Sequence, residues 1–391
     1  MYVSESAEPS EIQDHQDHQD HQDHQDHQDH QDHQDHQDHQ DHQDHKQADS
    51  AYDMERYSRQ IRFAPFGSEG QRRLSTSHAL IIGAGALGTG IAETLVRSGI
   101  GTLTIADRDY VEWSNLQRQQ LYDENDAISR TPKAIAALNR LSAINSSVKI
   151  HAHVLDVNVE ELEELIAGAD IIMDATDNFD TRLLINDIAC KYSIPWIYGG
   201  CVGSYGITYT FIPGKTPCLN CLLGSVPLGG DTCDTSGILP QAVQLVTAHQ
   251  TSEALKLLSG HEDVLRDKLL SFDVWRNEQV AIGVNNAKKA DCPSCGPAPR
   301  YPYLDAANRQ KTDVLCGRDT VQIRPSRKQQ ISLKDMAEQL EKAGAQVTLN
   351  PFLLSLDLGE NRIVLFPDGR ALIHGTKDIA RARSLYHRYF G

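Results

Sequence analysis

A glycine-rich segment between a predicted strand and a predicted helix restricts the fold more than any other part of the sequence. The strand is predicted over residues 79–82, the segment reads Gly83-Ala-Gly-Ala-Leu-Gly88, and the helix covers 89–98 until Gly99 ends it. Gly83, Gly85 and Gly88 permit a tight turn, close approach of the backbone to a phosphate, and close packing of the helix. The helix N-terminus adds NH donors and a positive potential. The segment therefore predicts a nucleotide-binding unit.

Strands and helices of about ten residues alternate beyond this segment. The predicted strands are 103–106, 148–154, 170–175 and 196–198, and the predicted helices are 132–141, 160–166, 181–192 and 242–258. Such alternation is typical of a mostly parallel sheet with helices on both faces. Residues 51–299 are therefore expected to form one Rossmann-like α/β domain.

The pattern changes after a proline-containing linker at residues 288–299. Short strands are predicted over 321–323, 347–349, 353–358, 363–366 and 371–373, with a tight turn at Pro367-Asp-Gly. One helix is expected to begin after Ser332 as its N-cap and to end at Gly344, and a second covers 377–389. Residues 300–391 are thus predicted to form a small α+β domain, which we interpret as a domain that docks a partner or supports a dimer.

Residues 1–50 are dominated by a Gln-Asp-His repeat that runs from Gln13 to His45 and contains 11 histidines. The repeat has almost no apolar side chain to bury, so we expect it to be disordered. Its histidines could bind a divalent metal, but we favour an expanded repeat or an affinity tag without a role in the fold, because a flexible coil fixes no ligand geometry.

The net charge of −17 resides mostly in this tail, since residues 1–50 hold 15 acidic residues and one basic residue. The remaining residues carry 39 acidic and 36 basic groups, so their net charge of −3 gives no reason to expect nucleic acid as a partner. The sequence has no apolar run of about 18 residues and no secretory pattern at its start. We therefore expect a cytoplasmic protein that does not bind a membrane.

Polar residues follow the second predicted strand. Asp107 lies 19 residues beyond Gly88, where a carboxylate can accept hydrogen bonds from ribose hydroxyls, and Asp109 follows it. A nicotinamide dinucleotide would suit these features alone. The next candidate side chains are those of Asn115, Gln117 and Arg118, and Lys133 lies further along the chain. An arginine and a lysine together favour a triphosphate whose pyrophosphate must leave.

Two aspartates lie near the end of the strand predicted over 170–175. Asp177 lies just beyond it, at the carboxyl edge of the sheet where open α/β folds bind ligands, so it is a candidate ligand of Mg²⁺. Asp174 lies inside the strand and is expected to be structural.

Four of the eight cysteines form two Cys-x-x-Cys pairs, Cys218/Cys221 and Cys292/Cys295. Four thiolates in this pattern predict a closed tetrahedral Zn²⁺ site that ties distant segments together, whereas a redox motif does not need a second copy. The site is expected to be structural, because four protein ligands leave no open position for catalysis. The thiols at 190, 201 and 316 are expected to be core or incidental.

Taken together, these motifs resemble the ThiF/MoeB family of sulfur-carrier-protein adenylyltransferases, bacterial relatives of ubiquitin-activating enzymes. The resemblance spans about residues 54–297 and includes, in order, Arg-Tyr-Ser-Arg-Gln at 56–60, the glycine segment, Ser114-Asn-Leu-Gln-Arg-Gln119, Pro132-Lys133, Ala175-Thr-Asp-Asn178 and both cysteine pairs. The sequence departs from the family where Ala86 replaces a frequent glycine, which requires a negative φ at that position.

The resemblance implies a function and roles for individual residues. The chain would use ATP to adenylylate the C-terminal Gly-Gly carboxylate of a ubiquitin-like sulfur carrier, ThiS-like or MoaD-like, before thiocarboxylate formation for thiamine or molybdopterin synthesis. Arg118 and Lys133 would bind the phosphates, Asp107 the ribose, and Asp177 the Mg²⁺. Arg59 would reach across a homodimer interface into the neighbouring site.

The resemblance also makes Cys233 a candidate for covalent bonding to the carrier or its sulfur, because family members carry a cysteine in this loop. In some members the residue is dispensable, so both interpretations stay open. Two other functions also remain: a nicotinamide-dependent oxidoreductase, and a non-catalytic adaptor that binds a ubiquitin-like protein. The first leaves the arginine, the lysine and the zinc site unexplained, and intact phosphate and metal ligands argue against the second.

Overall fold

The computed structural model describes residues 55–223, 236–305, 312–314, 319–324 and 329–390. The chain divides into two compact units, Met1–Phe63 and Ala64–Gly391. The described part of the first unit contains the short helix α2 (Ser58–Ile61), on which Arg59 is exposed. The Gln-Asp-His repeat, Cys233 and Cys316 lie outside the described residues.

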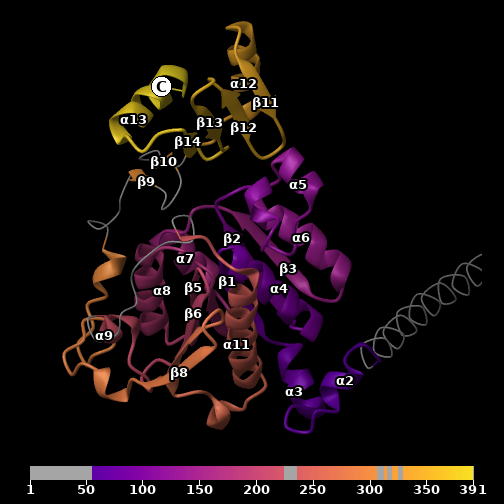
Figure 1. The fold of residues 1–391 in the computed structure, drawn as a ribbon, viewed down its shortest axis with the longest axis vertical. Coiled ribbons are helices and arrows are strands. Elements are labelled where there is room, and N and C mark those ends of the chain that lie inside the picture. Colours follow the sequence, from indigo (N-terminus) through magenta and orange to yellow (C-terminus); the bar gives the residue numbers. More distant parts are fainter. Residues whose placement is uncertain (1–54, 224–235, 306–311, 315–318, 325–328, 391) are drawn as a thin grey trace, which may run out of the picture. The chain divides into compact units, whose positions relative to one another are not determined.

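An eight-stranded sheet in the order β3-β2-β1-β4-β5-β6-β7-β8 forms the centre of the α/β domain (Figure 1). Its strands are β1 (His78–Ile82), β2 (Thr102–Asp107), β3 (Lys149–Val154), β4 (Ile171–Asp174), β5 (Trp196–Val202), β6 (Tyr205–Phe211), β7 (Lys268–Asp273) and β8 (Glu278–Gly283). Strands β1 to β5 pair in parallel, and β5 to β8 pair antiparallel. The predicted mostly parallel α/β sheet is confirmed, but the three antiparallel strands β6, β7 and β8 were not predicted.

Helices cover both faces of this sheet. They are α3 (Gly67–Leu74), α4 (Ala86–Ser98), α5 (Glu124–Ser129), α6 (Lys133–Ile144), α7 (Val159–Leu165), α8 (Phe179–Tyr192), α9 (Leu219–Leu222) and α11 (Pro240–Leu258). Alternate residues of β1 face opposite cores, since Ala79 and Ile81 pack with α4, α6 and α11 whereas Leu80 and Ile82 pack with α7 and α8. Among the described residues, no helix is long and apolar enough to cross a membrane.

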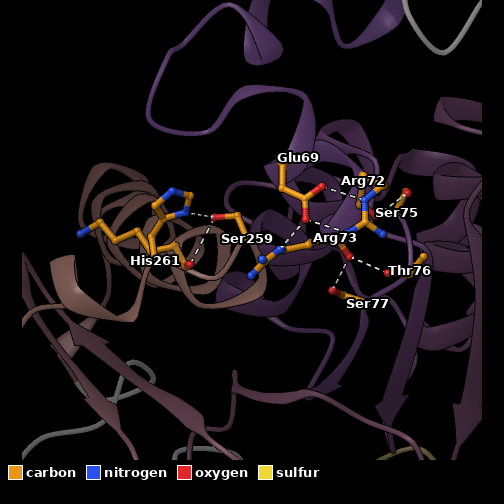
Figure 2. A network of polar contacts seen from close by, with 9 residues as sticks. Glu69, Arg72, Arg73, Ser75, Thr76, Ser77, Ser259 and His261 are labelled. Atoms are coloured by element: carbon orange, nitrogen blue, oxygen red, sulfur yellow. Dashed lines mark hydrogen bonds and ion pairs between the residues drawn. The ribbon is translucent and has the colours of Figure 1, made fainter.

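The C-terminal end of α3 is fixed by a polar network (Figure 2). Glu69 accepts hydrogen bonds from the Nε atoms of Arg72 at 2.8 Å and Arg73 at 2.9 Å. These two hydrogen bonds lower the pKa of the exposed Glu69 carboxyl to about 2, and the bond from Arg72 contributes most. The carbonyl of Arg73 accepts the hydroxyls of Thr76 and Ser77, so the chain turns tightly before it enters β1.

A second, antiparallel sheet in the order β11-β12-β13-β14-β10-β9 forms the C-terminal α+β domain. Its elements are β9 (Thr312–Val314), β10 (Thr320–Ile323), α12 (Leu333–Lys342), β11 (Gln346–Leu349), β12 (Leu354–Asp357), β13 (Arg362–Leu365), β14 (Ala371–His374) and α13 (Ile379–Phe390). Both helices pack on the sheet in one apolar core. The sequence predicted five of these strands and both helices, including the N-cap Ser332, whose side chain accepts the Asp335 NH. It did not predict β9.

Candidate nucleotide site and metal centre

The three glycines between β1 and α4 have different structural roles. Gly83 has a φ of +99°, and a Cβ atom there would lie 2.6 Å from the carbonyl oxygen of Ala175. A Cβ atom on Gly88 would lie 1.9 Å from the carbonyl oxygen of Gly83, so only glycine lets α4 pack this closely. A Cβ atom on Gly85 would meet nothing within 4 Å. Gly85 therefore faces open space in front of the helix, where a phosphate can approach the backbone.

Two contacts hold the glycine loop in place. The Gly83 NH donates to the carbonyl of Ala106 in β2, at 2.8 Å. The buried Tyr122 hydroxyl donates to the carbonyl of Ala84 at 2.6 Å and to that of Lys133 at 3.2 Å. Tyr122 thus ties the loop to the start of α6. The sequence carried no signal for this role, because Tyr122 belongs to no recognisable motif.

Asp107 lies at the end of β2 against the same loop. Its carboxylate accepts the Ala84 NH at 2.6 Å and the Asp109 NH at 2.7 Å, which leaves further lone pairs on each oxygen. Burial raises the pKa of Asp107, and the nearby Lys133 ammonium opposes this rise. A half-buried carboxylate at the end of β2, next to the loop that precedes α4, is where recognition of a ribose was expected.

Lys133 begins α6 and is buried beside these groups. Its ammonium lies 3.4 Å from Oδ2 of Asp109, and its side chain is only 4% exposed. Burying an ammonium group is unfavourable unless charged or hydrogen-bonding partners compensate for its lost hydration. The buried Lys133 and the half-buried Asp107 and Asp109 therefore form one charge cluster next to the glycine loop.

The segment after Asp109 contains the short 3-10 helix η1 (Trp113–Asn115). Asn115 is buried, and its Oδ1 accepts the Glu112 NH at 3.0 Å, which fixes the start of η1. Arg118 is half-buried and donates to the Ser114 carbonyl at 2.8 Å, while Gln117 is exposed. These hydrogen bonds of Asn115 and Arg118 stay within the segment from Glu112 to Arg118.

Two aspartates lie at the end of β4: Asp174 is its last residue, and Asp177 lies three residues further on. Asp174 is fully buried and pairs with Arg182 of α8, whose Nε lies 3.3 Å from Oδ2. Its other oxygen accepts the Thr176 NH and hydroxyl, so Asp174 is structural. Asp177 is exposed at the carboxyl edge of the sheet. It is close enough to Arg108, beyond β2, to raise that residue's pKa together with Asp156 and Asp109.

Arg59 and Cys233, two of the predicted site residues, are not among the site residues described above. Arg59 belongs to the first compact unit, and Cys233 lies outside the described residues. Ala86, the departure from the family pattern, begins α4 and has a negative φ, so its methyl group fits the helix. The expected glycine loop is thus compatible with alanine at this position.

The four paired cysteines converge although their pairs are separated by about 70 residues. Cys218 is the N-cap of α9 and Cys221 lies within it, whereas Cys292 and Cys295 lie in the linker after β8. The Sγ atoms of Cys218 and Cys221 lie 3.9 Å apart, those of Cys218 and Cys292 lie 3.6 Å apart, and those of Cys221 and Cys295 lie 3.5 Å apart.

These distances fit a tetrahedral zinc site, in which Zn–S bonds of about 2.3 Å place the sulfurs about 3.8 Å apart. All four Sγ atoms lie within 4.8 Å of one another. The Lys289 NH also donates to the Cys221 sulfur at 3.4 Å, as expected for a thiolate. Cys190, which was expected to be a core or incidental thiol, packs against this cluster.

Comparisons with known proteins agree with this geometry. The sequence model of the ThiF family matches residues 57–294. The chain is 54% identical over 336 residues to the protein named sulfur carrier protein ThiS adenylyltransferase of Bacillus subtilis (strain 168), covering 86% of this chain and 99% of that protein. It is 36% identical over 245 residues to the Escherichia coli K12 protein of the same name, covering 62% of this chain and 96% of that protein.

Two further matches are to another named relative and to a solved structure. The SAMP-activating enzyme E1 of Haloferax volcanii is 36% identical over 248 residues, covering 63% of this chain and 90% of that protein. Among solved structures, E. coli MccB with ATP aligns with a TM-score of 0.54 at 22% identity, covering 62% of this chain and 74% of that chain. At this identity the likeness concerns the fold alone.

Proposed function

The chain belongs to the ThiF family, and from this membership we propose that it is a nucleotidyltransferase that adenylylates the C-terminal carboxylate of a ubiquitin-like sulfur carrier at the expense of ATP. The observation that carries the proposal is the cluster of Asp107, Asp109 and the buried Lys133 against a glycine loop in which Gly85 faces open space. In this cluster the Asp107 carboxylate suits ribose hydroxyls and the Lys133 ammonium suits phosphate oxygens.

The reaction needs positioning and charge stabilisation rather than a general base. The carrier carboxylate is already ionised at neutral pH, and its oxygen attacks the α-phosphorus of ATP while the bond to the bridging oxygen of pyrophosphate breaks. The NH groups at the start of α4 and the Lys133 ammonium stabilise the charge on the phosphates. Arg118 is the second proposed phosphate ligand, and Asn115 and Gln117 lie in the same segment.

Asp177 is the proposed protein ligand of Mg²⁺, because it is an exposed carboxylate at the edge of the sheet where the phosphates would lie. The ion supplies charge neutralisation on the phosphate oxygens when bound. Asp174 does not share this role, since Arg182 and Thr176 already occupy its oxygens.

The four-cysteine cluster is the proposed Zn²⁺ site, with a structural role. Its four sulfurs complete a tetrahedron, so a bound zinc would have no open position for a reactant. The site would connect α9 to the linker before the C-terminal domain.

The proposed partner is a carrier that ends in Gly-Gly. The relatives from B. subtilis and E. coli are named for ThiS, which makes a ThiS-like carrier and thiamine synthesis the first candidates. The MOCS3 relatives are named adenylyltransferase and sulfurtransferase, and a MoaD-like carrier of molybdopterin synthesis is the second. We further propose a cytoplasmic homodimer with Arg59 acting in the partner's site, and Cys233 as a residue for covalent attachment of the carrier.

ATP–pyrophosphate exchange tests the proposal. Purified full-length chain, Mg²⁺ and ATP should exchange labelled pyrophosphate only when a Gly-Gly-ending carrier from the same genome is added, since the adenylate must form reversibly. A carrier lacking its last glycine is the matched control. An absence of exchange with every such carrier would refute the proposed function, and it would reopen the oxidoreductase and adaptor interpretations.

A further inference from the structure

The C-terminal domain contacts the segment that immediately follows the ribose carboxylate. Arg362, the first residue of β13, donates through Nη2 to the Tyr110 hydroxyl at 2.8 Å and to Glu112 at 3.3 Å. His374, the last residue of β14, places Nε2 3.0 Å from the same hydroxyl. Tyr110 is 3% exposed. Two strands of the C-terminal sheet thus hold one side chain that lies three residues beyond Asp107.

A second set of contacts joins the domain to the end of β3. Asp156 follows β3, and its side chain is 11% exposed. It accepts hydrogen bonds from Arg108 at 3.2 Å and from Gln322 of β10 at 2.6 Å, and it also pairs with Arg324. The preceding Leu155 NH donates to the Asp107 carbonyl at 3.1 Å. The contacts to Asp156 are therefore connected to the backbone of Asp107 through the neighbouring residue Leu155.

Apolar packing seals the space between these two polar contacts. Tyr110 and Val154 share one core with four residues of the C-terminal sheet: Leu353, Val364, Phe366 and Leu372. All four are at most 1% exposed. Because buried apolar side chains pack without voids, a shift of the loop at Tyr110 would require the sheet to shift with it.

We infer that the C-terminal domain positions the ATP site, and that Arg362 is the positioning residue that fixes the segment from Arg108 to Glu112 through Tyr110. This inference rests on the proposed function, because it concerns the same nucleotide. The segment connects Asp107 and Asp109 to η1 and Arg118, so its conformation sets the distance between the ribose carboxylate and the phosphate-binding arginine. Within the described residues, the hydrogen bonds of Arg362 go to Tyr110 and Glu112, and neither of these is a proposed nucleotide ligand.

The expected consequence is a loss of nucleotide affinity without an equal loss of turnover. If the segment adopts the binding conformation in only a fraction of molecules, the apparent Kd rises by the inverse of that fraction, whereas molecules saturated with ATP are all in that conformation. Removing Arg362 should therefore raise the Kd and the KM for ATP by about five- to twentyfold while kcat changes less than about twofold.

The test compares four full-length variants by titration calorimetry with a non-hydrolysable ATP analogue and Mg²⁺, and by pyrophosphate exchange. Arg362→Ala and Tyr110→Phe should both raise the Kd, and Arg362→Lys should restore most of the affinity because an ammonium can still donate to the Tyr110 hydroxyl. Arg381→Ala is the matched control, since Arg381 pairs with Glu360 within the C-terminal domain and should leave the Kd unchanged. Thermal unfolding of each variant shows whether it is folded.

Each outcome supports or overturns the inference. Raised Kd values for Arg362→Ala and Tyr110→Phe with rescue by lysine support it. A Kd within twofold of the unsubstituted chain for both variants overturns it and leaves the proposed function intact, as does a fall in kcat at unchanged KM. Affinity lost equally in the lysine and control variants overturns it as a general effect on folding. An unsubstituted chain that binds no ATP overturns both proposals.

Discussion

Gly85 and Gly88 lie three residues apart, yet the structure assigns them opposite sensitivities. Gly88→Ala places a methyl group against the Gly83 carbonyl, so we expect the free energy of unfolding to fall by about 1–3 kcal/mol. Gly85→Ala meets no protein atom at a φ of −83°, so stability should change by less than about 0.5 kcal/mol. Its methyl group would instead occupy the phosphate space and weaken ATP binding.

Denaturant titration and calorimetry with ATP distinguish the two variants. The expected pattern is a stable Gly85→Ala variant with impaired ATP binding and a destabilised Gly88→Ala variant. Normal ATP affinity in Gly85→Ala would show that the phosphates do not lie in front of α4.

Asp177 offers a second test at the residue scale. Asp177→Ala should reduce exchange by at least about a hundredfold, because a group that stabilises charge in the reaction is removed. The melting temperature should stay the same, since the side chain is exposed. Asp180→Ala, an exposed aspartate in the first turn of α8, is the control and should retain exchange. Full activity in Asp177→Ala would rule out its role with Mg²⁺.

The sequence could predict individual candidate ligands but not all the residues that hold them in place. The glycines and Asp107 follow a fixed spacing after a strand, so their position was predictable. Tyr122 was not, because its contact with Ala84 joins positions 38 residues apart and depends on how α6 packs. Likewise, the Ala84 and Asp109 NH groups that bind the Asp107 carboxylate are backbone donors, which leave no trace in side-chain patterns.

At the scale of elements, prediction succeeded where strands are buried on both faces. Strands β1, β2 and β4 lie within one residue of their predicted bounds, because parallel strands covered by helices are continuous apolar runs. The edge strand β8 is exposed at all six residues, and its sequence Glu-Gln-Val-Ala-Ile-Gly has no such run. Its pairing with β7 depends on the fold as a whole, so local sequence could not reveal it.

The cysteine cluster links α9 to the linker after β8, so removing one of its thiols should affect both zinc binding and stability. Cys292→Ser should lower the zinc content from about one atom per chain and reduce the melting temperature, because metal binding contributes to folding. Cys201→Ser, at a half-buried cysteine of β5 outside the cluster, should keep the zinc. Zinc content by atomic emission and thermal unfolding are the measurements. A fully active, stable protein purified without zinc would contradict the structural role.

At the scale of the whole molecule, the carboxylate of Asp156 should make stability depend on pH. Burial acts to raise its pKa, but the guanidiniums of Arg108 and Arg324 outweigh burial and hold the pKa below its usual range. A carboxylate with a lowered folded-state pKa stabilises the fold above its unfolded pKa of about 3.9, and this contribution disappears as the pH falls through the folded value.

The comparison with Asp156→Asn isolates this effect from other carboxylates. The variant should be less stable than the unsubstituted chain at pH 7, and the difference in melting temperature should shrink as the pH is lowered from about 5 to 3. A difference that stays constant over this range would show that Asp156 is not held ionised by its arginines.

The contact between the two sheets was beyond sequence-based prediction. The C-terminal α+β domain was expected from its strand pattern, but its partners Tyr110 and Asp156 lie more than 150 residues away from their contacts on β10 and β13. The B. subtilis relative matches 336 residues of the chain, more than residues 1–299 contain, so that match extends into the C-terminal domain. The domain is thus shared with a relative rather than an isolated addition.

The mass of the carrier tests the central claim most directly. Full-length chain, ATP and Mg²⁺ are incubated with a Gly-Gly-ending carrier, quenched in acid, and the intact carrier is weighed by mass spectrometry. The account predicts a carrier heavier by one adenylyl group, and no change in a carrier that lacks its terminal glycine. An unmodified carrier for every candidate, or equal modification of the truncated one, would contradict adenylylation of the C-terminal carboxylate.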